Sequence, residues 1–252
     1  MRASGAPPRT NRHLLAAATV EKAWAAKLGA AGAIAIAYFV AARLGLTLLS
    51  PPSEVAVFWP ASGIAVGILI VLGRRAGPAV VLGVVVGTVA ANLMSDRSFS
   101  ASLSKGLCNA GEAVIAAWLL ERWFGRPFTF GNLHRVVGFL AAAGLATAAS
   151  ATGGAATMIL LHSPAPYWDV WRAWLLADGV GIVVVAPLVI GLGQMWRAPP
   201  SRGEWIEGLG ALALFALMVV FVETYPTGSW LSFSPGILLL PPLVWLTARC
   251  SA

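Results

Sequence analysis

Charged and amide side chains interrupt the long apolar runs of this 252-residue chain, and these side chains are its candidates for chemistry. Lys105, Cys108, Asn109 and Glu112 follow one another at i, i+3, i+4 and i+7, which places them on one face of a helix. A charged side chain at the middle of a bilayer costs about 3 kcal/mol even on the mildest scale, so it normally faces the protein interior. We therefore expect this polar face to point into a bundle of helices.

Two further charges lie inside apolar runs. Asp178 lies in the sixth run, between Trp174 and Gly181, and Gly179 and Gly181 would let another helix or a ligand approach closely. Arg43 lies in the first run. At 1.5 Å per residue, Arg43 and Asp178 are both predicted roughly 10 Å below the outer surface.

Two interpretations of these residues stay open. In the first, Arg43 and Asp178 form an ion pair that only fixes the register of two helices. In the second, an outward-opening polar pocket binds a small ligand, and its lining residues are Arg43, Asn92, Asn109, Glu112, Trp174 and Asp178.

The sequence lacks the common motifs of enzymes and metal sites. The chain has no glycine-rich phosphate loop with lysine, no His-Glu-x-x-His and no Gly-x-Ser-x-Gly. Its three histidines are far apart in sequence, and Glu112 with Asp178 lacks the nucleophile–base spacing of a hydrolase. We predict no catalytic residue, no metal site and no cofactor.

The elements that must position these residues are membrane-spanning helices. Hydrophobic residues make up 58% of the chain and charged residues only 11%, against roughly 25% charged in soluble domains. A span needs about 20 apolar residues, and in lipid such runs fold as helices unless they alternate as barrel strands do. We predict an all-α bundle of about eight spans, at residues 28–50, 57–73, 77–95, 101–121, 136–161, 172–195, 205–223 and 231–248.

The basic residues predict the orientation of this bundle. Alternate connections hold 13 of the 17 lysines and arginines, so by the positive-inside rule both termini are cytoplasmic. Because these residues are scattered rather than collected in a patch, nucleic acid is excluded as a partner. We expect a basic cytoplasmic segment at residues 1–23 and an integral membrane domain at 24–252. The 13 residues are Arg2, Arg9, Arg12, Lys22, Lys27, Arg74, Arg75, Arg122, Arg126, Arg135, Arg197, Arg202 and Arg249.

Small residues, prolines and tryptophans mark expected packing points. Pairs of glycines four residues apart, Gly63/Gly67 and Gly83/Gly87, favour close helix packing, either within the chain or between two copies of it. Pro60, Gly181 and Pro187 are further candidates for packing contacts and kinks. All eleven tryptophans fall near predicted span ends, as in an interfacial aromatic belt.

Four stretches of the chain together resemble the membrane-associated sensor domain of the first type, one of the MASE families of bacterial signalling proteins. They are Ala37–Leu46, Val57–Val66, Asn109–Ala113 with Trp118–Leu120, and Trp174–Gly181 with Val185–Leu188. Asn92 fits the family's asparagine at the end of the third helix. Ala61 departs from the second proline that many members carry.

The resemblance implies a multi-pass domain of the bacterial inner membrane that senses a signal and passes it to an output domain. Such outputs are histidine kinases or diguanylate cyclases, hence two-component or cyclic-di-GMP signalling. It implies a sensory module rather than an enzyme, with an output protein and a second copy as partners. Compared with the usual architecture of the family, the chain looks like an isolated or truncated module. The apolar runs and the polar cluster predict lipid and a small ligand as further partners. The alternative is a small-solute transporter or its binding subunit, because intramembrane charges and prolines also form transport sites.

Overall fold

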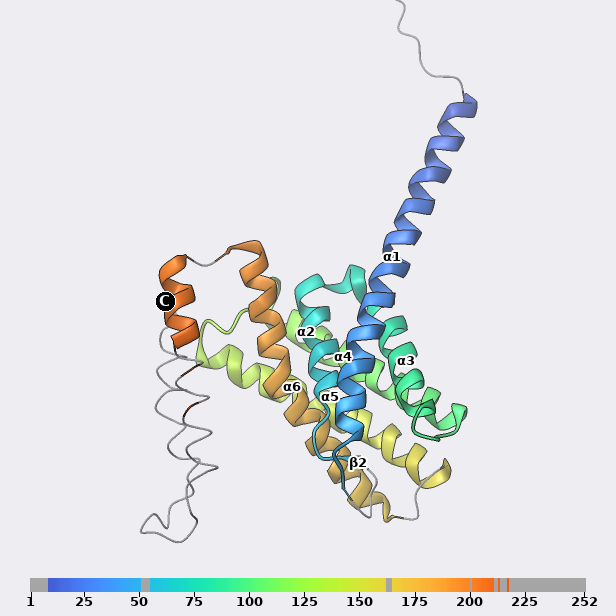
Figure 1. The fold of residues 1–252 in the computed structure, drawn as a ribbon, viewed down its shortest axis with the longest axis vertical. Coiled ribbons are helices and arrows are strands. Elements are labelled where there is room, and N and C mark those ends of the chain that lie inside the picture. Colours follow the sequence, from blue (N-terminus) through green and yellow to red (C-terminus); the bar gives the residue numbers. More distant parts are fainter. Residues whose placement is uncertain are drawn as a thin grey trace, which may run out of the picture.

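The computed structural model describes residues 9–50, 55–161, 165–199 and 201–210, together with residues 213 and 217. These residues form an almost entirely helical protein (Figure 1). The elements are α1 Arg9–Leu46, β1 Leu49–Ser50, β2 Val55–Ala56, α2 Pro60–Leu72, the 3-10 helix η1 Arg74–Ala76, α3 Gly77–Leu93, α4 Phe99–Phe124, α5 Leu133–Leu161 and α6 Tyr167–Arg197.

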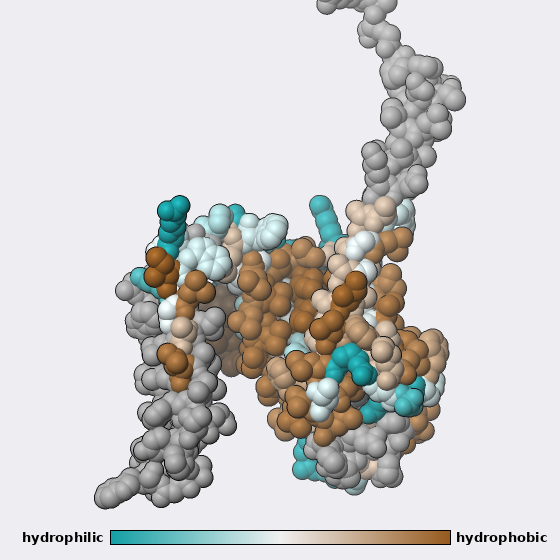
Figure 2. Space-filling view, in the orientation of Figure 1, coloured by the Kyte–Doolittle hydropathy of each residue, from teal (hydrophilic) through white to brown (hydrophobic). Residues whose placement is uncertain are grey.

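Four helical segments are long and apolar enough to cross a bilayer: Trp24–Leu46, Arg74–Leu93, Leu133–Leu161 and Tyr167–Arg197. Large apolar side chains remain exposed on the outer faces of these helices, such as Ile36, Leu145 and Leu188. Figure 2 shows hydrophobic side chains covering the flanks of the bundle. The chain is therefore a multi-pass membrane protein, and the exposed apolar faces are the surface that lipid would cover.

Two predicted spans, 57–73 and 101–121, are absent from this set of four for different reasons. The helix of the first, α2, begins only at Pro60, because proline suits the first helical turn, where no backbone donor is needed. Its 13 residues are about 20 Å long, shorter than the hydrocarbon core. The second, α4, is long enough but carries the polar face predicted from the sequence, with Lys105, Asn109 and Glu112 buried.

The helices alternate in direction along the chain, and α4 lies at the centre of the bundle. Helix α4 packs against α2, α3 and α5, while α2 and α6 pack side by side and α1 packs on α3. Because successive helices run in opposite directions, the C-terminal ends of α1, α3 and α5 lie at the same end of the bundle as the N-terminal ends of α2, α4 and α6. The N-terminal part of α1 projects well beyond the other helices (Figure 1).

Two details differ from the expected spans. The first span, predicted to reach residue 50, ends at Leu46. A short antiparallel ribbon follows, in which Leu49 pairs with Ala56 and Ser50 with Val55. This ribbon was not predicted, since two-residue strands lack a periodic pattern.

The predicted seventh span, 205–223, lies mostly outside the described residues, as does the whole eighth span, 231–248. The chain is helical at 202–210. Ser201 and Glu204 start this helix with a reciprocal capping box: the Ser201 amide donates to Glu204 Oε2 at 2.6 Å, and the Glu204 amide donates to Ser201 Oγ at 3.4 Å. The hydrogen bond from the Ser201 backbone holds the pKa of Glu204 below its usual value.

Candidate functional site

A small polar pocket lies at the end of the bundle where α1 and α3 end and α4 begins. The β1–β2 ribbon and Leu46 form its apolar wall, and its polar wall contains Asn92, Asn109 and Asp178, with the indole of Trp174 beside them. The pocket encloses about 40 Å³, room for roughly three water molecules. Four of the six residues predicted to line a pocket therefore lie around this one.

Several buried polar atoms of the pocket have no hydrogen-bond partner among the described residues. They include Oδ1 of Asn109 and Oγ1 of Thr88. Nε1 of Trp174 and Oδ2 of Asp178 interact at most with each other at the pocket wall. A buried donor or acceptor left without a partner costs about 1–3 kcal/mol. Asn109 Oδ1 thus offers a free acceptor to a small polar molecule, and Trp174 and Asp178 offer a donor and an acceptor beside it.

Tyr38 joins the pocket wall to the core of the bundle. Its side chain is fully buried, and its hydroxyl accepts a hydrogen bond from Asn109 Nδ2 at 2.8 Å and one from Trp59 Nε1 at 3.2 Å. The three side chains come from α1, from α4 and from the residue that precedes α2. Tyr38 and Trp59 were not predicted as site residues, because a tyrosine or a tryptophan in an apolar run has no distinctive spacing.

Glu112 lies beneath the pocket and faces Asp178. Both carboxyl groups are buried, with 1% and 4% of the side chain exposed. Their polar neighbours are Ser62 of α2 and, for Glu112, Ser150 of α5. The carboxyl group of Glu112 interacts with both serine hydroxyls and with Asp178. Four helices thus meet at a cluster of polar oxygens, which we call the acid cluster (Ser62, Glu112, Ser150 and Asp178).

The start of α2 docks directly on α6 beside the acid cluster. The amide of Trp59 donates to the carbonyl of Ala177 at 3.1 Å. A Cβ atom on Gly63 would collide with the Gly181 carbonyl, and one on Gly181 would collide with the Trp59 carbonyl. Gly67 likewise packs against Val189, so these glycines serve packing within the chain. Pro187 continues α6 beyond this contact without ending the helix.

Arg43 lies apart from Asp178, and the ion pair considered for them does not form. Arg43 Nη1 donates to Ser95 Oγ at 2.6 Å and to the Ala91 carbonyl at 3.4 Å. Because α1 ends at Leu46, Arg43 lies in its last turn, where a cation interacts favourably with the helix dipole. Asp178 lies 11 residues after the first residue of α6, Tyr167, which is about 17 Å along the helix. Arg43 therefore does not line the pocket.

Two basic residues that the site prediction left out, Arg97 and Lys105, also line the pocket. Both are buried, at 7% and 6% exposed. Lys105 belongs to the predicted polar face of α4, whereas Arg97 follows α3 in a connection, where sequence spacing carries no signal.

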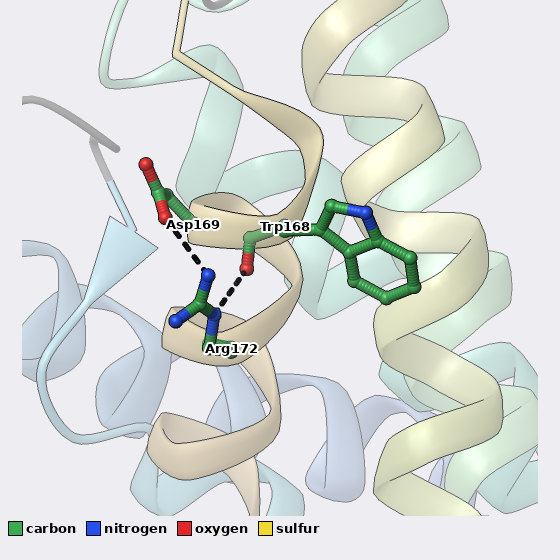
Figure 3. Close-up of polar contacts among 3 residues, drawn as sticks. All are labelled: Trp168, Asp169 and Arg172. Carbon is green, nitrogen blue, oxygen red and sulfur yellow. Dashed lines mark hydrogen bonds and ion pairs between the residues drawn. The ribbon is translucent and has the colours of Figure 1, made fainter.

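The tryptophans divide between the site and the surface. Trp59 and Trp174 are buried at the pocket. The prediction that they belong to an interfacial aromatic belt was therefore wrong. Trp168 in the first turn of α6 is 62% exposed. Beside it, Arg172 Nη2 lies 3.4 Å from Asp169 Oδ1, and Arg172 Nε donates to the Trp168 carbonyl (Figure 3). This ion pair is exposed and outside the pocket, which makes Asp169 a matched control for Asp178.

Comparison with known proteins gives one family. The family model MASE1 matches residues 30–251. No curated protein and no solved structure gives a significant match to the chain.

Proposed function

This chain belongs to the MASE1 family of membrane sensory domains, and on that premise we propose that its signal acts in the polar pocket above the acid cluster. In this proposal a small polar molecule hydrogen-bonds to Trp174, Asn109 and Asp178. The observation that supports it most is that these residues present buried polar atoms to one pocket, among them Oδ1 of Asn109, which has no partner among the described residues. A chain that only needed stability would gain by replacing them with apolar residues.

The proposed relay runs from the pocket through α6. Asp178 belongs both to the pocket and to the acid cluster, and Gly181 one turn later carries the backbone contact with Trp59. A ligand that binds Asp178 alters its interaction with Glu112 and thereby the packing of α6 on α2. The ligand can shift this packing only by its difference in affinity for the two arrangements. Pro187, which removes one backbone hydrogen bond, makes the following part of α6 easier to bend.

The proposed topology is an eight-span bundle of the bacterial inner membrane with both termini in the cytoplasm. The arginines predicted to be cytoplasmic lie at the end of the bundle opposite the pocket, beside the end of α2, α4 or α6: they include Arg74, Arg75, Arg122, Arg126 and Arg197. The pocket then opens toward the outside, and α6 carries the change to the cytoplasmic side. Residues 1–23 form the cytoplasmic segment and 24–252 the membrane domain.

The proposed output is a cytoplasmic histidine kinase or diguanylate cyclase that works as a dimer. The output reads the position of the helices that follow α6, either as a covalently attached domain or as a partner protein. Because the glycine pairs are used inside the chain, we place the dimer contact elsewhere, on the exposed apolar faces.

Hydrogen–deuterium exchange of the full chain in lipid nanodiscs tests the relay. We expect Asp178→Asn to change amide exchange in α6 beyond Pro187 and along α2, because it alters the acid cluster. The matched variant Asp169→Asn makes the same chemical change at an exposed position, and its effect should stay in the first turn of α6. If Asp178→Asn changes exchange only within one turn of residue 178, the relay is refuted.

A further inference from the structure

A second cavity, of about 200 Å³, opens at the end of the bundle opposite the polar pocket. It lies between the α2–α3 connection and the C-terminal half of α4. This volume far exceeds the roughly 10–15 Å³ that one water molecule requires. It is separate from the polar pocket and shares no lining residue with it.

The polar mouth of this cavity carries a net positive charge. Arg74, Arg126 and Glu121 line it, which gives one positive charge in excess. The guanidinium group of Arg126 lies against Gly73, so closely that a Cβ atom there would overlap it. Gly73 also has φ of +78°, a conformation that favours glycine. The backbone at Gly73 thus leaves room for the Arg126 guanidinium beside Arg74.

The deep wall of the cavity is apolar and belongs to one face of α4. Val114, Ala117, Trp118 and Glu121 line the cavity at i, i+3, i+4 and i+7. Val114 and Trp118 are 40% and 52% exposed. This face changes from apolar to charged toward the end of α4, which matches an amphiphile with a polar head and an apolar tail.

In the proposed topology, the membrane boundary runs through the same cavity. One of the four candidate spans begins at Arg74, so the arginines lie at the level of the lipid headgroups. The wall around Val114 lies about 10 Å deeper along α4 than Glu121, within the hydrocarbon. Basic pockets between membrane helices are suited to anionic lipid headgroups.

We propose that this cavity binds an anionic glycerophospholipid of the phosphatidylglycerol type. Its phosphodiester lies between Arg74 and Arg126, whose planar guanidinium groups suit phosphate oxygens. One acyl chain lies along Val114 and Trp118. The single negative charge of the phosphodiester complements the single excess positive charge of the mouth.

Native mass spectrometry of the full chain with added phosphatidylglycerol tests this site. The double variant Arg74→Gln, Arg126→Gln should bind the lipid about tenfold more weakly, because two charge-assisted contacts are lost. The control Arg75→Gln, Arg122→Gln removes the same charge from two exposed arginines at the same end, neither of which lines the cavity. It should bind the lipid as the wild type does.

Three outcomes would overturn the proposal. Equal weakening in both double variants would mean a diffuse basic surface rather than a site. Equal binding of phosphatidylcholine would exclude recognition of the headgroup charge. Displacement of the lipid by millimolar inorganic phosphate would indicate a site for free anions. If the first double variant does not fold, Arg74→Gln alone repeats the test, because Arg74 is exposed.

Discussion

Asn109 donates a hydrogen bond of 2.8 Å to the hydroxyl of Tyr38, and this bond ties the polar face of α4 to α1 in the middle of the bundle. The same hydroxyl accepts from Trp59 at 3.2 Å. One buried oxygen thus satisfies two donors from different segments of the chain. The Tyr38 hydroxyl therefore links α1, α4 and the start of α2 beside the pocket.

Tyr38→Phe should lower the stability of the chain by about 1–3 kcal/mol, because Asn109 Nδ2 and Trp59 Nε1 lose their common acceptor while buried. Thermal unfolding in detergent, followed by circular dichroism, measures the change. Tyr167→Phe is the matched control, since the Tyr167 hydroxyl makes one exposed hydrogen bond to the Thr152 carbonyl at 3.3 Å. A loss of stability in Tyr167→Phe as large as in Tyr38→Phe would refute the role assigned to Tyr38.

Glu112→Gln and Asp178→Asn should be non-additive, because the two carboxyl groups face each other in one buried cluster. We expect a coupling energy of about 0.5–3 kcal/mol from a double-mutant cycle of unfolding free energies. The control cycle pairs Glu112→Gln with Asp169→Asn, whose side chain is exposed, and should be additive within about 0.5 kcal/mol. Additivity in the first cycle would mean that the acids do not interact.

Gly181→Ala should destabilise the chain by about 1–3 kcal/mol or more, since the added methyl group overlaps the backbone of Trp59. The control is Gly144→Ala in α5, where nothing lies within 4 Å of the added atom. Its stability should change by less than about 1 kcal/mol. Thermal unfolding of both variants decides the matter, and an unchanged melting temperature for Gly181→Ala would contradict the close packing of α2 on α6.

The topology predicts opposite labelling of two exposed positions. In a background with both native cysteines replaced, Arg75→Cys should be inaccessible to a membrane-impermeant maleimide in intact cells, and Asp169→Cys should react. Inverted membrane vesicles provide the control and should reverse the result. Labelling of both positions from one side would exclude the proposed alternation of spans.

The bounds of two helices were largely predictable from the sequence, because each apolar run ends at charged or polar residues. The expected spans 77–95 and 136–161 lie within two or three residues of α3 and α5 at each end. The sequence predicted which residues share a helix face only within a single helix, as for Lys105, Asn109 and Glu112 of α4. Glu112 and Asp178 were both recognised as intramembrane acids, but the sequence holds no information on which helices become neighbours.

The wrong predictions for Arg43, Trp59 and Trp174 arose because the sequence does not show exactly where a helix ends. The first span was extended to residue 50 because Thr47–Ser50 is apolar enough for lipid, yet α1 stops at Leu46. This moved Arg43 one turn deeper than it lies and suggested the pair with Asp178. Trp59 and Trp174 were assigned to the membrane surface by their position near span ends, although both are buried and line the pocket.

The most direct test of the central claim is a thermal-shift screen of the full chain against small polar compounds, such as amino acids, organic acids, sugars and phosphorylated sugars. We predict that at least one compound raises the melting temperature of the wild type and of Asp169→Asn, but not of Asp178→Asn or Asn109→Leu. The same compound should not accumulate in proteoliposomes. Stabilisation that persists in both pocket variants, or uptake into the proteoliposomes, would contradict a sensor whose signal binds in this pocket.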